Sequence, residues 1–132
     1  MAAIVVVDDE VEVGEAIRRV LMQAGFEVTV VSNAEAGLRA IDEKPPDVVV
    51  TDIIMPKTHG LELVKILRTR HPRVRVIAIS GGGSFGIQAY KPDAISTHAY
   101  LAAAREAGAQ EILTKPFDLS ELLAAVRRQL PN

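Results

Sequence analysis

The stretch Pro46-Asp47-Val48-Val49-Val50-Thr51-Asp52-Ile53-Ile54-Met55-Pro56 lies in the middle of the chain and gives the clearest indication of its fold. A continuous apolar run between prolines predicts a strand that is buried on both faces, as in a parallel sheet. The run ends on Asp52, where the strand is expected to leave the core. Because ligands of open α/β sheets bind outside the carboxyl ends of the strands, Asp52 is a candidate functional residue.

Strand-like and helix-like segments alternate along the rest of the chain. Besides the Asp52 strand, strands are predicted at residues 2–7, 27–31, 74–79 and 111–114. Helices are predicted at 10–24, from a cap at Ser32 or Asn33 to Pro45, at about 60–70, from a cap at Asp93 or Ser96 to 107, and from Asp118 onward. This alternation predicts an α/β fold with a five-stranded parallel sheet and helices on both faces. A closed barrel would need eight units, so an open, doubly wound sheet is expected.

Composition excludes several classes of protein. A chain of 132 residues predicts one domain, and its formal charge of −2 gives no reason to expect direct binding of nucleic acid. The sequence contains no cysteine, which excludes disulfides and thiolate metal sites. Neither a long apolar run nor a signal-like N-terminus is present, so we expect no membrane association and a cytoplasmic location.

Reactive polar residues follow several of the predicted strands. Asp8 and Asp9 come after the first strand, Asp52 ends the third, Ser80 follows the fourth and Lys115 follows the fifth. The carboxyl ends of parallel strands meet at one edge of a sheet, so these side chains are expected to lie close together. Taken singly, each has another explanation, since such residues also cap helices or occupy solvated turns.

The chemistry of this group favours phosphoryl transfer with a metal ion. Carboxylates about 4 Å apart repel by roughly 4 kcal/mol at an intermediate dielectric, which Lys115 offsets in part and a divalent cation offsets further. An all-oxygen site of this kind suits Mg²⁺. A carboxylate such as Asp52 can attack phosphorus to form an acyl phosphate. The oxygens of the phosphoryl group would then contact the metal, the Lys115 ammonium and the Ser80 hydroxyl.

This constellation resembles the receiver domain of two-component response regulators, and the likeness covers nearly the whole chain. It rests on Asp8-Asp9, on Asp52 with Met55-Pro56, on Ser80-Gly81 and on Lys115-Pro116-Phe117, in this order after successive strands. The resemblance implies a flavodoxin-like, CheY-like fold with strand order 2-1-3-4-5. Residues 1–132 would form a single receiver domain.

The resemblance also implies a role for each site residue. Asp52 would be the phosphorylation site, with Ser80 and Lys115 as catalytic residues. Asp9 would bind Mg²⁺ directly together with Asp52 and the backbone carbonyl of Ile54. Asp8 would act on the metal mainly through ordered water, and the peptide bond between Lys115 and Pro116 would be cis.

The sequence departs from the family pattern in two places. Receivers usually carry Tyr or Phe three residues before the lysine, where the ring reports phosphorylation, but this switch position is Ile112. The segment between Ser80 and Lys115 is also longer than usual, with the excess at about 82–95. Both departures fall on the surface that receivers use for output, so we expect an altered choice of partner.

The expected function is therefore that of a receiver in two-component or phosphorelay signalling. The phosphoryl donor would be a sensor histidine kinase or a histidine phosphotransfer protein. Since the sequence ends at Pro131-Asn132, just after the last predicted helix, output is expected through contacts with a downstream protein. A phosphorylation-dependent homodimer is a further alternative. The chain would not be an enzyme beyond its own phosphoryl transfer and autodephosphorylation.

Two other functions compete with this interpretation. A hydrolase or phosphatase of related fold could use Asp52 as its nucleophile, but such enzymes typically need a general-acid Asp two residues later, where this chain has Ile54. A receiver-like adaptor that is never phosphorylated would be compatible with Ile112. The retained acidic, hydroxyl and lysine positions argue against that adaptor.

Overall fold

The computed structural model describes residues 2–53, 60–80, 102–114 and 117–130, and the following concerns these ranges. The strands are β1 (Ala3–Val7), β2 (Glu27–Val31), β3 (Val48–Asp52), β4 (Arg75–Ser80) and β5 (Glu111–Thr114). The helices are α1 (Val11–Gln23), α2 (Ala34–Glu43), α3 (Gly60–Arg70) and α5 (Leu119–Gln129), and residues 102–107 are also helical. The predicted elements are confirmed to within two residues at the ends that can be compared. The expected start of the helix at residues 93–96 lies outside the described ranges.

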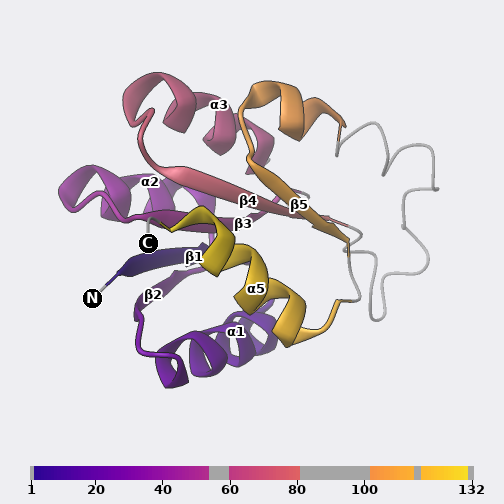
Figure 1. Ribbon diagram of the computed structural model, residues 1–132. Coiled ribbons are helices and arrows are strands. Elements are labelled where there is room, and N and C mark those ends of the chain that lie inside the picture. The colour runs from indigo at the N-terminus through magenta and orange to yellow at the C-terminus, as the bar shows by residue number, and fades with distance from the viewer. Residues whose placement is uncertain (1, 54–59, 81–101, 115–116, 131–132) are drawn as a thin grey trace.

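All five strands form one parallel sheet in the order β2-β1-β3-β4-β5 (Figure 1). This confirms the doubly wound topology and the strand order 2-1-3-4-5. β3 lies at the centre, with Val50 opposite Val6 of β1 and Ile77 of β4. The carboxyl ends of β1, β3 and β4 therefore lie next to one another, as the phosphoryl-transfer prediction requires.

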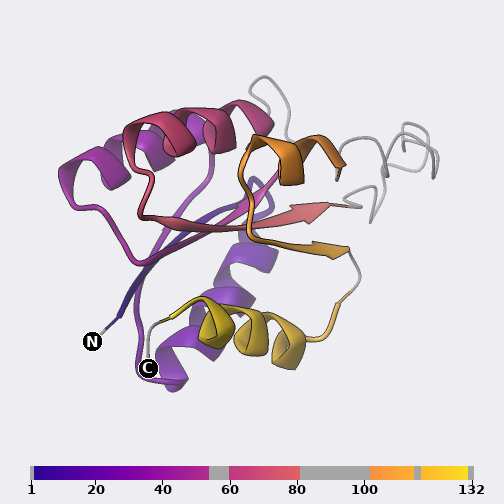
Figure 2. The same ribbon diagram turned by 45° about the horizontal axis from the view of Figure 1, so that its top comes forward.

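Two apolar layers cover the sheet, and alternate residues of each strand enter different layers. α2, α3 and the helical residues 102–107 lie on one face, whereas α1 and α5 lie on the other (Figure 2). In β1, Val5 and Val7 pack in the first layer, and Ile4 and Val6 pack in the second. This alternation is the period of two that a strand imposes on its side chains. It explains why β1, which is covered on both faces, is apolar along its whole length rather than alternating.

The polar residues at the ends of the elements behave largely as their chemistry predicts. The side chain of Asn33 accepts a hydrogen bond of 2.8 Å from the Ala36 amide and caps α2. Glu121 accepts a bond of 2.9 Å from the Asp118 amide at the start of α5, as in a capping box. Gly25 and Gly108 follow helices with φ of 97° and 128°, a left-handed conformation that favours glycine.

A bidentate ion pair joins the end of α5 to the start of β5. Nε and Nη2 of Arg128 donate to the two carboxylate oxygens of Glu111 at 2.9 and 2.7 Å, and the Gln129 amide donates to the same carboxylate at 2.6 Å. The hydrogen bonds from Arg128 are the main cause that holds the pKa of Glu111 below its ordinary value of 4.5. The pair therefore holds α5 against β5, the edge strand of the sheet.

Replacement of Glu111 by glutamine is expected to lower the midpoint of thermal unfolding by a few degrees at pH 7. The folded pKa of Glu111 is depressed, so its stabilisation is complete above the unfolded value near 4.5 and is lost as the pH falls through the folded value. The difference between wild type and variant should therefore shrink in unfolding scans below pH 4.5. Glu15→Gln, which breaks an exposed pair with Arg18, serves as the control with a smaller effect. A pH-independent difference would contradict this account.

Candidate functional site

Asp52 is a buried carboxylate at the carboxyl end of the central strand. Its residue is only 2% exposed, and its backbone pairs with Ile79 in the register of β3 and β4. The preceding residue, Thr51, is fully buried and donates its hydroxyl to the Asp52 carbonyl at 3.0 Å. The following amide, of Ile53, donates to the carbonyl of Ile79 at 2.9 Å. The sheet therefore fixes the backbone on both sides of the candidate nucleophile.

Gly60, the first residue of α3, packs directly on the backbone of Asp52. The amide of Gly60 donates to the Ile53 carbonyl at 3.1 Å, which brings the chain back to the strand end. A Cβ atom built on Gly60 would overlap the carbonyl oxygen of Asp52 and lie 2.9 Å from the Ile53 Cα. Because a backbone carbonyl cannot swing aside as a side chain can, this position requires glycine. Gly60 thus helps to hold Asp52 in place.

Asp8 and Glu10 lie at the neighbouring strand end, where β1 leads into α1. The Asp8 amide donates to the Val31 carbonyl at 3.1 Å, which keeps Asp8 in line with the sheet. Its Oδ1 accepts a hydrogen bond of 2.8 Å from the Glu10 amide. Glu10 is the N-terminal cap residue of α1 and has an extended backbone, with φ of −91° and ψ of 107°. The turn thus has a fixed shape, with both acids at its ends.

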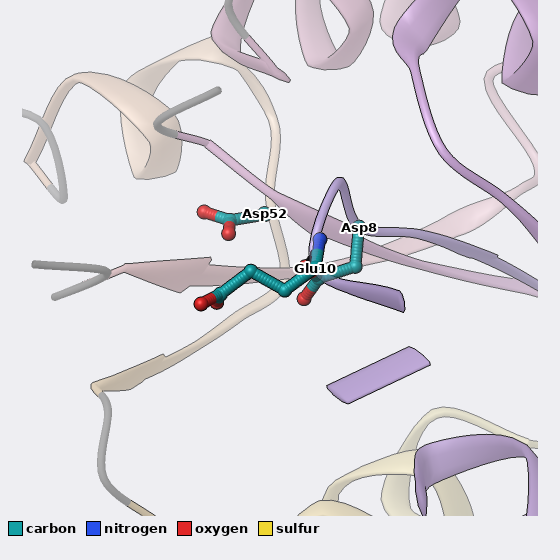
Figure 3. Close-up of side chains that lie close together, drawn as sticks. All are labelled: Asp8, Glu10 and Asp52. Atoms are coloured by element: carbon teal, nitrogen blue, oxygen red, sulfur yellow. Dashed lines mark hydrogen bonds between the residues drawn. The ribbon is translucent and has the colours of Figure 1, made fainter. Parts of the chain in front are cut away.

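Three carboxylates converge at this edge of the sheet. One ligand oxygen from each of Asp8, Glu10 and Asp52 lies within 4.8 Å of the others (Figure 3). Asp8 and Asp52 are buried and Glu10 is half-buried. At these separations, like charges repel by roughly 3 to 4 kcal/mol per pair at an intermediate dielectric. A positive charge placed near these carboxylates would therefore stabilise them.

The donor set fits a hard divalent cation. All three side chains offer carboxylate oxygens, which are the ligands that Mg²⁺ prefers, and no described residue of the group offers nitrogen or sulfur. Mg²⁺ keeps several waters and usually takes only one or two carboxylates from the protein. Glu10 is only half-buried, and this partial exposure is compatible with water molecules bound to the metal.

The structure brings some of the predicted site residues together and leaves others unplaced. Asp8 and Asp52 are neighbours, as expected, and Ser80 ends β4 with its backbone paired to Thr114 of β5. Asp9, the expected direct ligand, is half-buried but does not belong to the group of three. Ile54 and Lys115 lie outside the described residues, as do the peptide bond to Pro116 and segment 82–95.

Glu10 is the residue that the sequence analysis missed. The alternation of a strand could not reveal this, because β1 ends at Val7 and Asp9 lies in a bend. The hydrogen bond from the Glu10 amide to Oδ1 of Asp8 closes this turn. The proposed switch residue Ile112 is half-buried in β5 and packs against the layer formed by α2 and α3.

The family model of the response regulator receiver domain matches residues 4–127. The chain therefore belongs to the response regulator receiver domain family, and its role is that of a receiver in two-component signalling. This confirms the resemblance on which the sequence analysis relied. It also argues against the rival hydrolase, since this family consists of receiver domains rather than conventional enzymes.

Two relatives and one solved structure illustrate the similarity. The DNA-binding transcriptional regulator NtrC of Bradyrhizobium is 32% identical over 97% of this chain and 24% of its own length. The transcriptional regulatory protein PrrA of Mycobacterium tuberculosis is 38% identical over 96% of this chain and 49% of its own. The receiver domain of NtrX from Brucella abortus superposes with a TM-score of 0.81 at 29% identity, over 96% of this chain and 97% of that domain.

The chain thus spans about a quarter of the NtrC relative and half of PrrA. The similarity to NtrX, in contrast, covers the receiver domain almost completely. What the relatives share with this chain is therefore the receiver domain itself. None of the helices in the described ranges combines the length and apolar character that a membrane crossing needs.

Proposed function

We propose that the chain accepts a phosphoryl group on Asp52, from the phosphohistidine of a sensor kinase or a histidine phosphotransfer protein, with Mg²⁺ as cofactor. The observation that supports this most is the placement of Asp52. It is buried at the end of the central strand, and carboxylate oxygens of Asp8 and Glu10 lie within 4.8 Å. A carboxylate that had only to cap a helix would not need two further acids around it.

The proposed reaction is a displacement at phosphorus. A carboxylate oxygen of Asp52 forms the new O–P bond as the N–P bond to the donor histidine breaks, and the imidazole leaves with its electron pair and takes up a proton. The bound cation would neutralise charge on the phosphoryl oxygens as they approach three carboxylates. Asp52 needs little motion for this step, because hydrogen bonds of Thr51 and Ile53 fix its backbone.

The remaining roles follow the resemblance to the family. We assign Lys115 to neutralise one phosphoryl oxygen and Ser80 to donate its hydroxyl to another. The backbone carbonyl of Ile54 and the carboxylates of Asp8 and Asp9 complete the proposed metal environment. Ser80 is supported by its place at the end of β4, beside the strand that ends in Asp52. Autodephosphorylation, in which water attacks the phosphorus of phospho-Asp52, would return the domain to its starting state.

Output is proposed to occur through contacts with a downstream protein, with the chain acting in the cytoplasm. Residues 1–132 would form one receiver domain, in which segment 82–95 alters the surface that partners recognise. Ile112 would replace the aromatic switch by repacking against the layer of α2 and α3, where it is already half-buried. A phosphorylation-dependent homodimer is compatible with the same surface.

Incubation with a small acyl-phosphate donor and Mg²⁺, followed by intact-mass measurement, tests this function. We expect the mass of one phosphoryl group to be added to wild type, and none to be added to Asp52→Asn or in the presence of a chelator. Asp47→Asn is a matched control, because Asp47 precedes the same strand but its carboxylate binds the Ala3 amide at 2.8 Å. It should be phosphorylated as fully as wild type.

Two outcomes would contradict the proposal. Wild-type protein with no adduct under any of these conditions would point to the adaptor that is never phosphorylated. Sustained turnover of a generic phosphate ester with Mg²⁺, lost in Asp52→Asn, would instead favour the hydrolase. An adduct that survives in Asp52→Asn would place the acceptor on another residue.

A further inference from the structure

We propose that a pocket at the amino ends of β3 and β4 binds an acidic, extended segment of a partner protein. The pocket has a volume of about 840 Å³ and is lined by the segment before β3, the segment before β4 and the end of α5. These three parts of the chain lie on the left of Figure 1, whereas the strands end at the opposite edge of the sheet. Asp52 ends β3 at that opposite edge, so the pocket is separate from the proposed phosphorylation site.

The pocket combines buried apolar residues with an exposed rim. Among its lining residues, Pro46 and Val74 are buried and Leu130 is half-buried, whereas Pro45 and Pro72 are exposed. Covering a proline costs no side-chain conformational entropy, unlike covering a long flexible side chain. An apolar side chain of a ligand would gain free energy by leaving water for this surface.

Hydrogen bonds of the backbone hold the walls of the pocket in place. The Asp47 amide donates to the Ala3 carbonyl at 2.8 Å, and the Asp47 carboxylate accepts from the Ala3 amide at the same distance. The Arg75 amide donates to the Asp47 carbonyl at 3.1 Å, which joins the walls formed before β3 and before β4. The Val74 amide donates to the His71 carbonyl at 3.0 Å. A pocket whose shape is fixed in this way pays little ordering cost when a ligand binds.

Three arginines line the pocket, and one of them already has a carboxylate partner. Both oxygens of Glu111 accept hydrogen bonds from Arg128 at 2.9 and 2.7 Å. Arg73 and Arg75 are exposed, and neither forms an ion pair with another residue in the described ranges. The planar guanidinium group presents donors in a fork that matches a carboxylate. Two such groups are therefore available to acidic side chains of a ligand.

The charge and shape of the pocket favour a peptide over other anions. Its lining residues include three arginines and one aspartate, Asp47, which gives a net formal charge of +2. That charge suits a few carboxylates, whereas binding of nucleic acid relies on many cationic contacts to phosphates. Pockets for small molecules enclose most of the ligand, but here Arg73 and Arg75 are exposed. An extended peptide can place acidic side chains on these arginines and an apolar side chain on the buried surface.

The two ends of the sheet carry opposite charges, which directs such a peptide to the pocket. Asp8, Glu10 and Asp52 gather at the carboxyl end, whereas the unpaired Arg73 and Arg75 line the pocket at the amino end. An acidic segment is repelled by the first group and attracted by the second. A partner bound in the pocket would therefore leave Asp52 accessible to a phosphoryl donor.

Fluorescence anisotropy with a short labelled peptide that alternates glutamate and leucine tests the proposal. We expect saturable binding to the intact chain, and binding about tenfold weaker when Arg73→Gln and Arg75→Gln are combined, because two charged donors are lost. Arg19→Gln combined with Arg39→Gln is the matched control, since both are exposed helical arginines that do not line the pocket. This control should change the dissociation constant less than about twofold, because distant exposed charges are screened by salt.

Two further measurements locate the binding and verify the folded state. Amide chemical shifts in NMR spectra should change at Val74 and Leu130 when the peptide binds, and not at Asp52. Circular dichroism should show the wild-type fold in both double variants, because all four arginines are exposed. Uptake of a phosphoryl group from a small acyl-phosphate donor should also be unchanged in both, so failure of this inference leaves the proposed function intact.

Several results would overturn the proposal. These are no saturable binding to the intact chain, equal losses in the two double variants, or shift changes centred outside the pocket. Equally tight binding of a peptide with glutamine in place of glutamate would show that the arginines do not select acidic side chains. Displacement of the peptide by inorganic phosphate or succinate at the same concentration would show that the pocket takes a small anion instead.

Discussion

Replacement of Gly60 by alanine is expected to lower the free energy of unfolding by about 3 kcal/mol and to slow phosphorylation of Asp52 at least tenfold. The new methyl group would overlap the carbonyl oxygen of Asp52, and overpacking against well-ordered atoms costs about 1 to 3 kcal/mol. The upper end applies here because the obstacle is backbone held by Thr51 and by the sheet. Either α3 or the end of β3 must shift, and both positions determine where the Asp52 carboxylate lies.

Urea unfolding and the rate of uptake from a small acyl-phosphate donor measure the two effects of Gly60→Ala. Gly14→Ala is the matched control, because a Cβ at Gly14 would meet only the side chain of Val30, at 3.0 Å. That side chain can move, and alanine is favoured over glycine inside a helix by about 1 kcal/mol, so stability should change little. Equal stability of Gly60→Ala and wild type would show that the contact between α3 and Asp52 is not tight.

Most of the fold could be predicted because its signals are local and consistent. β3 is buried along its whole length and begins with an unbroken apolar run, Val48–Val50, and Pro45-Pro46 separates it from the helix before it. Glycines at 25 and 108 end helices in the left-handed conformation that they adopt easily. The sheet order follows from the family resemblance rather than from these local signals. Alternation of strands and helices requires a parallel sheet but does not by itself determine which strand lies next to which.

The candidate site was less predictable, since it depends on directions of side chains. The sequence places Asp8, Asp9 and Glu10 together, and only the turn between β1 and α1 decides which of them face Asp52. In the structure the hydrogen bond from the Glu10 amide to Oδ1 of Asp8 closes this turn, and Asp8 and Glu10 lie in one group with Asp52. Similarly, nothing in the sequence of α3 shows that Gly60 packs on the Asp52 carbonyl. That contact depends on the path by which α3 returns to the sheet.

The sheet links the stability of the domain to the occupancy of the site. Asp8 directly follows β1 and Asp52 ends the central strand β3. The Asp8 amide donates to Val31 of β2, and the amide after Asp52, that of Ile53, donates to Ile79 of β4. The charged group is therefore part of the folded core rather than an attachment to it. Repulsion within the group is a cost to the native state that the unfolded chain avoids by separating the charges. A ligand that relieves this repulsion must stabilise the fold.

Saturating Mg²⁺ is therefore expected to raise the midpoint of thermal unfolding by roughly 10 °C. A ligand at one hundred times its dissociation constant stabilises the native state by about 2.7 kcal/mol, provided that it does not bind the unfolded chain. In a domain of this size that energy corresponds to roughly this shift in the midpoint. Asp52→Asn removes one of the buried carboxylates, so the Mg²⁺-dependent shift should fall to a small fraction of its wild-type value.

Scanning calorimetry with MgCl₂, and with NaCl at the same ionic strength, separates binding from screening. Salt alone weakens repulsion mainly between exposed charges, whereas Asp8 and Asp52 are each only 2% exposed. NaCl should therefore reproduce only a minor part of the shift, and a chelator should reverse the effect of MgCl₂. Equal shifts with both salts, or an undiminished shift in Asp52→Asn, would show that the cation does not bind at the three carboxylates. A shift specific to Mg²⁺ and dependent on Asp52 would mean that the charge that prepares this domain for phosphorylation also limits its stability until the metal binds.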